Sequence, residues 1–149
     1  MKGHVDLRIE SIRDIEFFAL SSYDMSPYLS QLGIQIEGKD MVAYGDSKTV
    51  TLTTEVRYVQ DYDTVNARLV LKYVNEMTFY IGNFEEIFRQ ENELYLFDKN
   101  LARFLLDIIT PTIRGILFVK TAGTGLAKCY LPLIRSDQII KDSGSIVEK

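Results

Sequence analysis

Two neighbouring stretches of the chain, residues 49–60 and 65–81, alternate apolar and polar side chains with a period of two. Such a period places every second side chain on the same face of an extended strand. In the second stretch this face carries Val65, Ala67, Leu69, Leu71, Tyr73, Met77, Phe79 and Ile81. Asp61 and Asp63 separate the two stretches as turn residues, which predicts an antiparallel hairpin. The pattern therefore commits this part of the chain to a sheet with one apolar face.

Two further stretches have weaker strand patterns. Residues 5–20 alternate, lose phase near residues 11–13 and then resume, as a strand with a β-bulge does. Residues 34–44 lie between Gly33 and a turn sequence at residues 45–47. Four antiparallel strands are therefore expected, and another element must cover their apolar face.

One long amphipathic helix is the expected cover. Its apolar residues recur at helical spacing: Leu101, Phe104, Leu105, Ile108, Ile109, Ile113, Ile116 and Leu117. Asp98 can cap its start and Pro111 interrupts the run, so we expect a long, bent helix over residues 98–117. Its apolar stripe is wide enough to contact both the sheet and a neighbouring molecule.

The remainder of the chain is expected to cross over and end in a short helix. Residues 121–125 have the composition of a flexible crossover. Ser136 can cap a C-terminal helix that Gly144 ends, and residues 143–149 are expected to be a frayed tail. The sequence thus predicts a single α+β domain over residues 1–149. In it, a four-stranded antiparallel meander is covered by one long helix, followed by a crossover loop and a short C-terminal helix.

Charge and cysteine content narrow the class of protein. The chain has 21 acidic and 17 basic residues, a net charge of −4, which argues against a nucleic-acid-binding surface. The single cysteine, Cys129, cannot form an internal disulfide and is typical of a reducing compartment. The chain shows no apolar stretch like that of a signal peptide or a membrane span. We therefore expect a cytoplasmic protein without membrane insertion.

Residues that enzymes use are scarce in this sequence. His4 is the only histidine, and Cys129 lies beside Tyr130 as a small buried hydrophobe would. Residues 123–125 (GTG) lack the preceding strand and the following Lys-Ser/Thr of a phosphate loop. No cluster of histidine and cysteine offers ligands to a transition metal. We predict no catalytic residues, no metal and no cofactor.

Several short sequences follow one another in a distinctive order. They are Arg13–Phe17 followed by Ala19, Met77–Gly82, Leu96–Phe97, Ala102–Arg103, Arg114–Gly115, and Leu131–Leu133 with Asp137. Together with the predicted order of elements, they span nearly the whole chain and resemble the SecB family of protein-export chaperones. The chain departs from the family's pattern at Glu91–Leu94, where the family usually has a longer segment with cysteine and proline.

The resemblance implies an ATP-independent holdase chaperone that binds unfolded or export-destined polypeptides. It also implies a homotetramer built as a dimer of dimers, in which first strands pair across one interface and long helices pack across the other. The helix residues that it implies at this interface are Leu101, Phe104, Leu105, Ile108, Ile109 and Ile113. The first strand agrees with this expectation, because Asp14 and Glu16 alone would guard a free sheet edge poorly.

Clients of such a chaperone would lie in apolar grooves between the sheet, the crossover and the last helix. Apolar residues on predicted loops are the candidate binding surface. They are Tyr28 and Leu29 after the first strand, and Leu126, Tyr130, Leu131 and Leu133 in the crossover. The alternative for each of them is that it packs beneath its own loop.

The resemblance also implies a site for the motor protein SecA, which the family binds through acidic side chains. The corresponding positions are Asp14, Phe18 and Lys72, of which only Asp14 is acidic. This difference argues against docking on SecA more than it argues against the fold.

Three alternatives remain open. The first is the same fold dedicated to one client, such as the antitoxin of a toxin–antitoxin pair. The second is a small-ligand-binding domain in which the helix closes over the sheet to form a cavity. The third, an enzyme, has little support in the residues.

Overall fold

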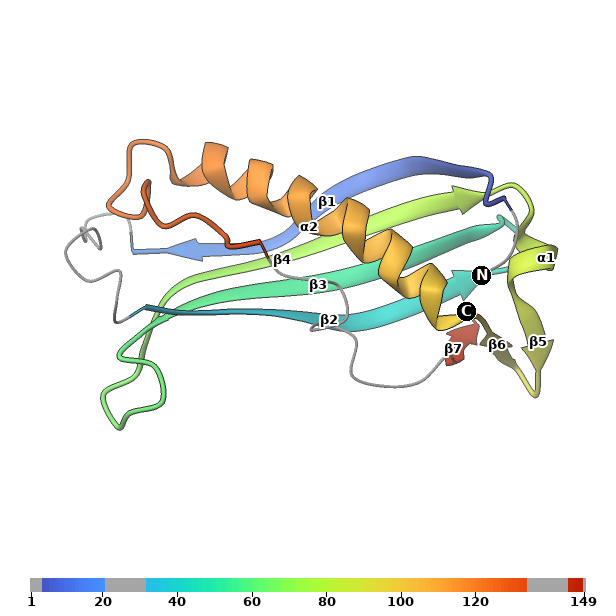
Figure 1. Ribbon diagram of the computed structural model, residues 1–149, viewed down its shortest axis with the longest axis horizontal. Coiled ribbons are helices and arrows are strands. Elements are labelled where there is room, and N and C mark those ends of the chain that lie inside the picture. Colours follow the sequence, from blue (N-terminus) through green and yellow to red (C-terminus); the bar gives the residue numbers. More distant parts are fainter. Residues whose placement is uncertain (1–3, 21–31, 134–144, 149) are drawn as a thin grey trace.

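The computed structural model describes residues 4–20, 32–133 and 145–148, which form seven strands and two helices (Figure 1). The four long strands are β1 (Leu7–Ala19), β2 (Leu32–Tyr44), β3 (Thr49–Gln60) and β4 (Arg68–Ile81). The short elements are α1 (Phe84–Ile87), β5 (Arg89–Glu91), β6 (Leu94–Leu96) and β7 (Ser145–Glu148), and the long helix is α2 (Lys99–Thr121). The class is α+β, as predicted.

The strands form one sheet in the order β1-β4-β3-β2-β7-β6-β5. Strands β2, β3 and β4 follow one another as antiparallel hairpins, but β1 pairs with β4 and not with β2. The predicted four-stranded meander is therefore wrong for the first strand. The reason is physical, because alternation determines the face on which a side chain lies and carries no information about which strand is its neighbour.

The long strands follow the predicted ranges closely. Strand β3 covers residues 49–60 as predicted, and β4 begins at Arg68, after a turn that contains Asp61 and Asp63. Strand β1 shifts register against β4 between Ile9 and Ser11 and again between Asp14 and Glu16. The predicted irregularity is thus confirmed, as two register shifts on either side of residues 11–13.

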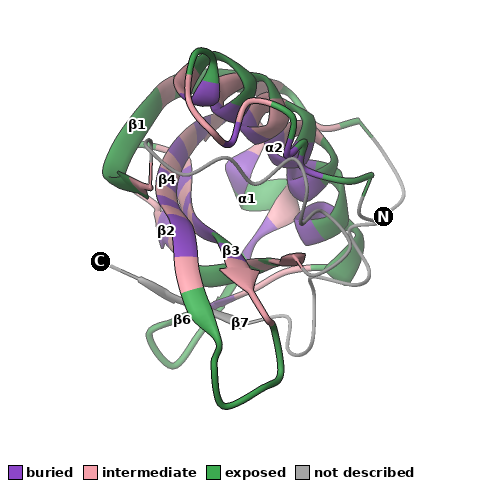
Figure 2. Cartoon of the chain, turned by 90° about the vertical axis from the view of Figure 1, so that its left-hand side faces the viewer, coloured by how far each residue is buried: buried purple, intermediate pink, exposed green. Residues whose placement is uncertain are grey.

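Helix α2 covers one face of the sheet, and the core lies between them (Figure 2). Asp98 caps the helix as predicted, since its carboxylate accepts a hydrogen bond from the Asn100 amide at 2.9 Å. The helix continues through Pro111 to Thr121, beyond the predicted end. Pro111 lies on the exposed side, while Ile109 and Ile113 on either side of it are buried against the sheet. Burial on both sides of the proline favours a continuous helix over a break.

The opposite face of the sheet carries a cluster of charged side chains. Its central carboxylate, Glu55, is buried beneath three longer basic side chains. Lys39, Arg57 and Lys72 approach its oxygens at 3.1, 3.4 and 3.5 Å. Burial on its own would raise the pKa of Glu55, but the hydrogen bond from Lys39 and the nearby charges outweigh it and lower this pKa.

The three short strands extend the sheet at one end and were missed in the sequence. Asn92 and Glu93 turn between β5 and β6 with positive φ values of 52° and 67°. Residues 145–148 form β7, so the predicted frayed tail over 143–149 is wrong for these four residues. The predicted C-terminal helix, from Ser136 to Gly144, lies outside the described residues.

Candidate functional site

A pocket of about 470 Å³ lies between the C-terminal half of α2 and the crossover that follows it. Its lining residues are Tyr58 of β3, Pro111, Arg114, Gly115, Leu117, Phe118 and Thr121 of α2, and Cys129, Tyr130 and Leu131 of the crossover. Most of these are apolar or aromatic, and Arg114 is the only charged one. The pocket therefore offers a ligand mainly apolar contact.

Polar contacts hold the crossover in place as one wall of this pocket. Arg114 donates hydrogen bonds from Nε to the carbonyl of Leu131 and from an Nη to that of Pro132, both at 2.9 Å. The chain leaves the helix through Gly123, whose φ of 77° suits glycine. The Cys129 amide then donates to the Leu126 carbonyl at 2.9 Å. The wall is thus fixed by hydrogen bonds to its main chain, two of which come from the Arg114 side chain.

The predicted client-binding residues of the crossover divide into two pairs. Leu126 and Leu131 are buried in the core, so the expectation that they offer exposed surface is wrong, and they pack beneath their own loop. Tyr130 and Leu133 are 59% and 89% exposed. Sequence pattern did not separate these pairs because a loop has no fixed period that assigns side chains to faces.

The remaining two candidates, Tyr28 and Leu29, lie outside the described residues. Two residues that the sequence analysis missed, Phe118 and Val119, are exposed on α2 near the crossover. The Phe118 ring stacks on Tyr130, with centroids 6.2 Å apart. Phe118 and Val119 could have been found in the sequence as two consecutive apolar residues that lie outside the buried stripe of the helix.

Tyr58 lies in the wall of the pocket, and its buried hydroxyl has no hydrogen-bond partner among the described residues. Burial raises the pKa of Tyr58 far above its ordinary value, so the phenol stays neutral. Cys129, in the same wall, is buried as predicted. The Tyr58 hydroxyl is therefore a polar group of the pocket wall that could hydrogen-bond a ligand atom.

Helix α2 also presents an apolar surface on its outward side, which shares Pro111, Gly115 and Phe118 with the lining of the pocket. Of the predicted interface residues, Leu101, Leu105, Ile109 and Ile113 are buried against the chain's own sheet. The outward positions form what we call the outer stripe: Phe104, Ile108, Pro111, Gly115, Phe118 and Val119. A neighbouring molecule could reach only the outer stripe, so Phe104 and Ile108 are the two predicted interface residues that remain candidates.

Asp14 is engaged within the chain. Its carboxylate accepts a hydrogen bond from the Tyr73 hydroxyl at 2.5 Å and pairs with the Lys120 ammonium at 2.6 Å. The Asn75 amide donates in turn to the Tyr73 oxygen at 3.0 Å. Hydrogen bonds from Lys120 and Tyr73 lower the pKa of Asp14. The residue predicted for SecA docking thus ties β1 to α2.

Strand β1 is an edge strand with exposed apolar side chains. One of its edges pairs with β4, and no strand among the described residues pairs with the other. Five large apolar side chains on it are exposed: Ile9, Ile12, Ile15, Phe17 and Phe18. An unpaired edge with such side chains is prone to associate with another chain.

Comparisons with known proteins leave the family open. No protein-family model and no curated protein sequence matches the chain. Among solved structures, one similar chain is a protein of unknown function from Streptococcus agalactiae. The identity is 13% and the TM-score 0.31, over 78% of this chain and 91% of that one. A similarity this low carries no argument about function.

No three His, Cys, Asp or Glu side chains within residues 4–20, 32–133 and 145–148 gather as ligands of a metal ion would. In the same ranges, neither helix combines the length and hydrophobicity needed to cross a membrane.

Proposed function

We propose that this protein is an ATP-independent holdase that binds unfolded or export-destined polypeptides. The observation that carries the proposal is the apolar pocket between α2 and the crossover, with exposed Phe118, Tyr130 and Leu133 beside it. Unrelated unfolded chains share apolar side chains and little else, so an apolar and aromatic surface is the chemistry that recognises them. The resemblance to the SecB family supports the same function.

The proposal includes a homotetramer, for which the outer stripe of α2 and the free edge of β1 are the candidate interfaces. Gly115 supports a contact between helices. A glycine inside a helix lowers its stability by about 1 kcal/mol relative to alanine, so its presence calls for a structural reason. A Cβ built at Gly115 meets nothing within 4 Å, so no contact within the described chain requires a glycine. Close approach of a neighbouring helix would require one.

The decisive test is whether the protein keeps a denatured client from aggregating. Wild type is expected to suppress aggregation at a few-fold excess without ATP. High salt should not abolish this effect, because salt weakens contacts between exposed charges and not apolar burial. Failure of wild type to delay aggregation would reject general holdase activity.

Substitutions beside the pocket locate the binding surface. Tyr130→Ala and Leu133→Ala should each weaken client binding by about 1 kcal/mol or more, as removal of a dominant contact does at other interfaces. Thermal stability should change little, because both side chains are exposed. The matched control is Val65→Ala, since Val65 is fully exposed in the turn between β3 and β4 and does not line the pocket. An equal loss of client affinity in Val65→Ala would mean that clients do not bind specifically beside the pocket.

Two alternatives share this pocket. A chaperone with one dedicated client, such as an antitoxin, is favoured by the engagement of Asp14 within the chain. It predicts one co-purifying protein and no general activity. A small-ligand site is favoured by the pocket volume and by the Tyr58 hydroxyl, which no group in residues 4–20, 32–133 and 145–148 satisfies. It predicts that small, mainly apolar molecules that carry one hydrogen-bonding group raise the thermal stability of wild type more than that of Tyr58→Phe.

A further inference from the structure

Strand β7 fills a space of one strand between two parts of the sheet. It pairs in parallel with β2, at Val42↔Val147 and Ala43↔Glu148. It pairs antiparallel with β6 on its other side, from Leu94↔Val147 to Leu96↔Ser145. Figure 1 shows β7 between these two strands, far along the chain from both. We call the space between Val42–Ala43 and Leu94–Leu96 the strand slot.

Both walls of the strand slot are held in place without β7. Strand β2 pairs with β3 from Leu32 to Tyr44. Strand β6 pairs with β5, and the Tyr95 ring packs edge-to-face on Phe84 and Phe88, with centroids 5.3 and 6.0 Å apart. Because these contacts are independent of β7, its departure would leave two strand edges facing each other.

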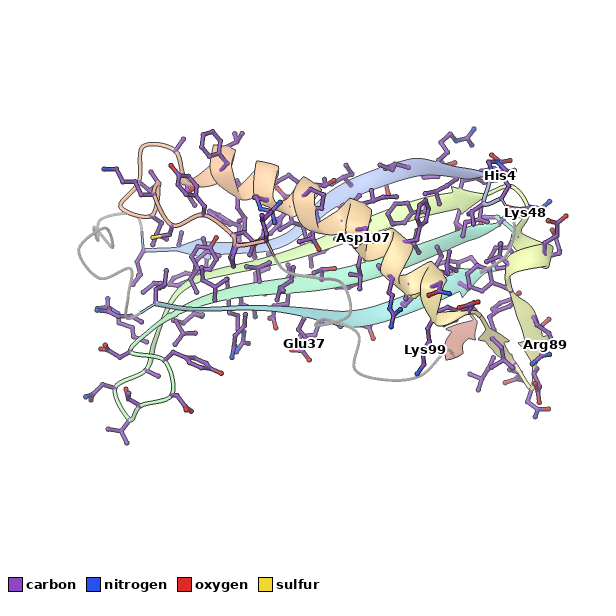
Figure 3. The ribbon with its side chains drawn as sticks, viewed as in Figure 1. His4, Glu37, Lys48, Arg89, Lys99 and Asp107 are labelled. Atoms are coloured by element: carbon purple, nitrogen blue, oxygen red, sulfur yellow. The ribbon has the colours of Figure 1, made fainter. Side chains whose placement is uncertain are left out.

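The strand slot is also limited in length. Toward the start of β2, the register shifts between Gly38 and Asp40, where Lys39 is the extra residue, and the charged Glu37 comes just before it. Glu37 projects from β2 there (Figure 3). A bulge and charged residues are features that protect a sheet edge from pairing. Toward its end, β2 stops at the turn of residues 45–48. The unguarded part of the edge therefore suits a segment of about four residues, the length of a short strand.

Recognition in the strand slot depends on the main chain. A strand that pairs on both sides is held by backbone hydrogen bonds, which every extended segment without proline can supply. Unfolded polypeptides expose such segments. The occupant of the slot in the free protein is the chain's own C-terminal strand, which competes at the high effective concentration of a tethered segment.

We infer that the strand slot is a second polypeptide-binding site, which takes one extended segment of an unfolded chain when that segment displaces β7. The choice of an unfolded polypeptide as partner rests on the proposed function. The pairing of β2 and β6 with β7 is observed independently of that function. The slot adds sequence-tolerant backbone hydrogen bonds to the apolar contacts of the pocket.

The test uses full-length Val147→Pro, because proline removes a backbone N–H in the middle of β7 and resists central strand positions. Val147→Thr is the matched control, since it keeps the N–H and the β-branched shape. Amide hydrogen exchange at Leu94–Leu96 should become at least tenfold faster in Val147→Pro and stay unchanged in the control. Exchange in β3 and β4 should be normal in both variants, which shows that the fold is intact.

A synthetic peptide with the sequence of residues 144–149 then probes the opened slot. It should bind Val147→Pro at least tenfold more tightly than wild type and restore slow exchange at Leu94–Leu96. The same peptide with N-methylated amides at positions 145–148 should not bind, because it lacks the donors. Equal affinity for wild type and Val147→Pro, or equal binding of the methylated peptide, would overturn the inference.

A final arm separates this inference from the proposed function. An extended peptide of unrelated sequence should also bind Val147→Pro, and a denatured client should compete with it. Binding of both peptides by a protein that fails the aggregation test would support the strand slot and reject the holdase. Binding of the residue 144–149 peptide alone would overturn the slot as a site for unfolded chains.

Discussion

Asp14 shows at the scale of single residues how one carboxylate connects distant parts of the chain. It lies on β1, and its two partners come from β4 and from the last turn of α2. The Lys120 ammonium also lies 5.1 Å from the centroid of the Phe17 ring, a cation–π distance. Lys120 thus joins two neighbours on β1, which fixes the end of α2 just before the crossover that walls the pocket.

Replacing Asp14 with asparagine should lower the free energy of unfolding by about 1 kcal/mol near neutral pH. The value is modest because the Asp14 side chain is 46% exposed, where water and salt screen the ion pair. Asparagine keeps an oxygen that accepts from Tyr73, so the loss is mainly the charge interaction. Denaturant unfolding of both proteins measures the difference.

The pH dependence of this difference has a definite sign. Because the pKa of Asp14 is lowered on folding, its charge stabilises the fold above the ordinary value of 3.8. This stabilisation is lost as the pH falls from that value through the lower pKa of the folded state. Wild type and Asp14→Asn should therefore converge in acid. The matched control is Glu10→Gln on the same strand, which loses only an exposed pair with Arg8 and should match wild type throughout. A difference from Asp14→Asn that persists at strongly acidic pH would contradict this account.

At the scale of elements, the crossover depends on helix α2 for its position. It contains no strand or helix of its own over residues 122–133, so side-chain contacts decide where it lies. Arg114 supplies two of them to consecutive carbonyl groups, and Leu126 and Leu131 anchor it in the core. An irregular segment becomes a defined wall when its carbonyl groups find such partners.

Arg114→Met should lower the stability of the protein by about 1–2 kcal/mol, because two hydrogen bonds from a charged group are lost. Methionine keeps much of the apolar length of arginine, so packing is largely retained. Amide exchange at the Cys129 amide should become faster while β3 and β4 stay protected. Arg103→Met, on the exposed side of the same helix, is the matched control and should change neither quantity. Unchanged exchange at Cys129 in Arg114→Met would mean that packing alone holds the crossover.

At the scale of the whole molecule, substitutions at two adjacent helix residues separate the role of the core from that of the proposed interface between subunits. Phe104 is exposed on the outer stripe, whereas Leu105 is buried against the sheet. Phe104→Asp should leave the fold intact and weaken self-association more than tenfold, because a charge at a desolvated contact is costly. Leu105→Asp should instead unfold the chain, with a loss of about 3 kcal/mol or more.

Light scattering and thermal unfolding together measure both outcomes. Wild type is expected as a tetramer of 17.1 kDa chains at micromolar concentration. A monomeric wild type would reject the proposed assembly. A Phe104→Asp protein that remains tetrameric would move the interface away from the outer stripe and toward β1.

The sequence by itself determined the elements whose evidence is local. The period of two in residues 49–60 is sufficient for β3, because an extended strand places alternate side chains on opposite faces. The cap at Asp98 and the helical stripe after it are sufficient for the start and inner side of α2. The burial of Cys129 also followed from its apolar neighbours.

Only the tertiary structure decided what depends on contacts between distant residues. The position of β1 beside β4 is a choice among sheet edges that all satisfy the same alternation. Leu131 is buried and Tyr130 exposed because Arg114 holds the crossover backbone against α2. Residues 145–148 are a strand because they pair with β2 on one side and with β6 on the other, and four residues alone carry too little pattern to reveal it.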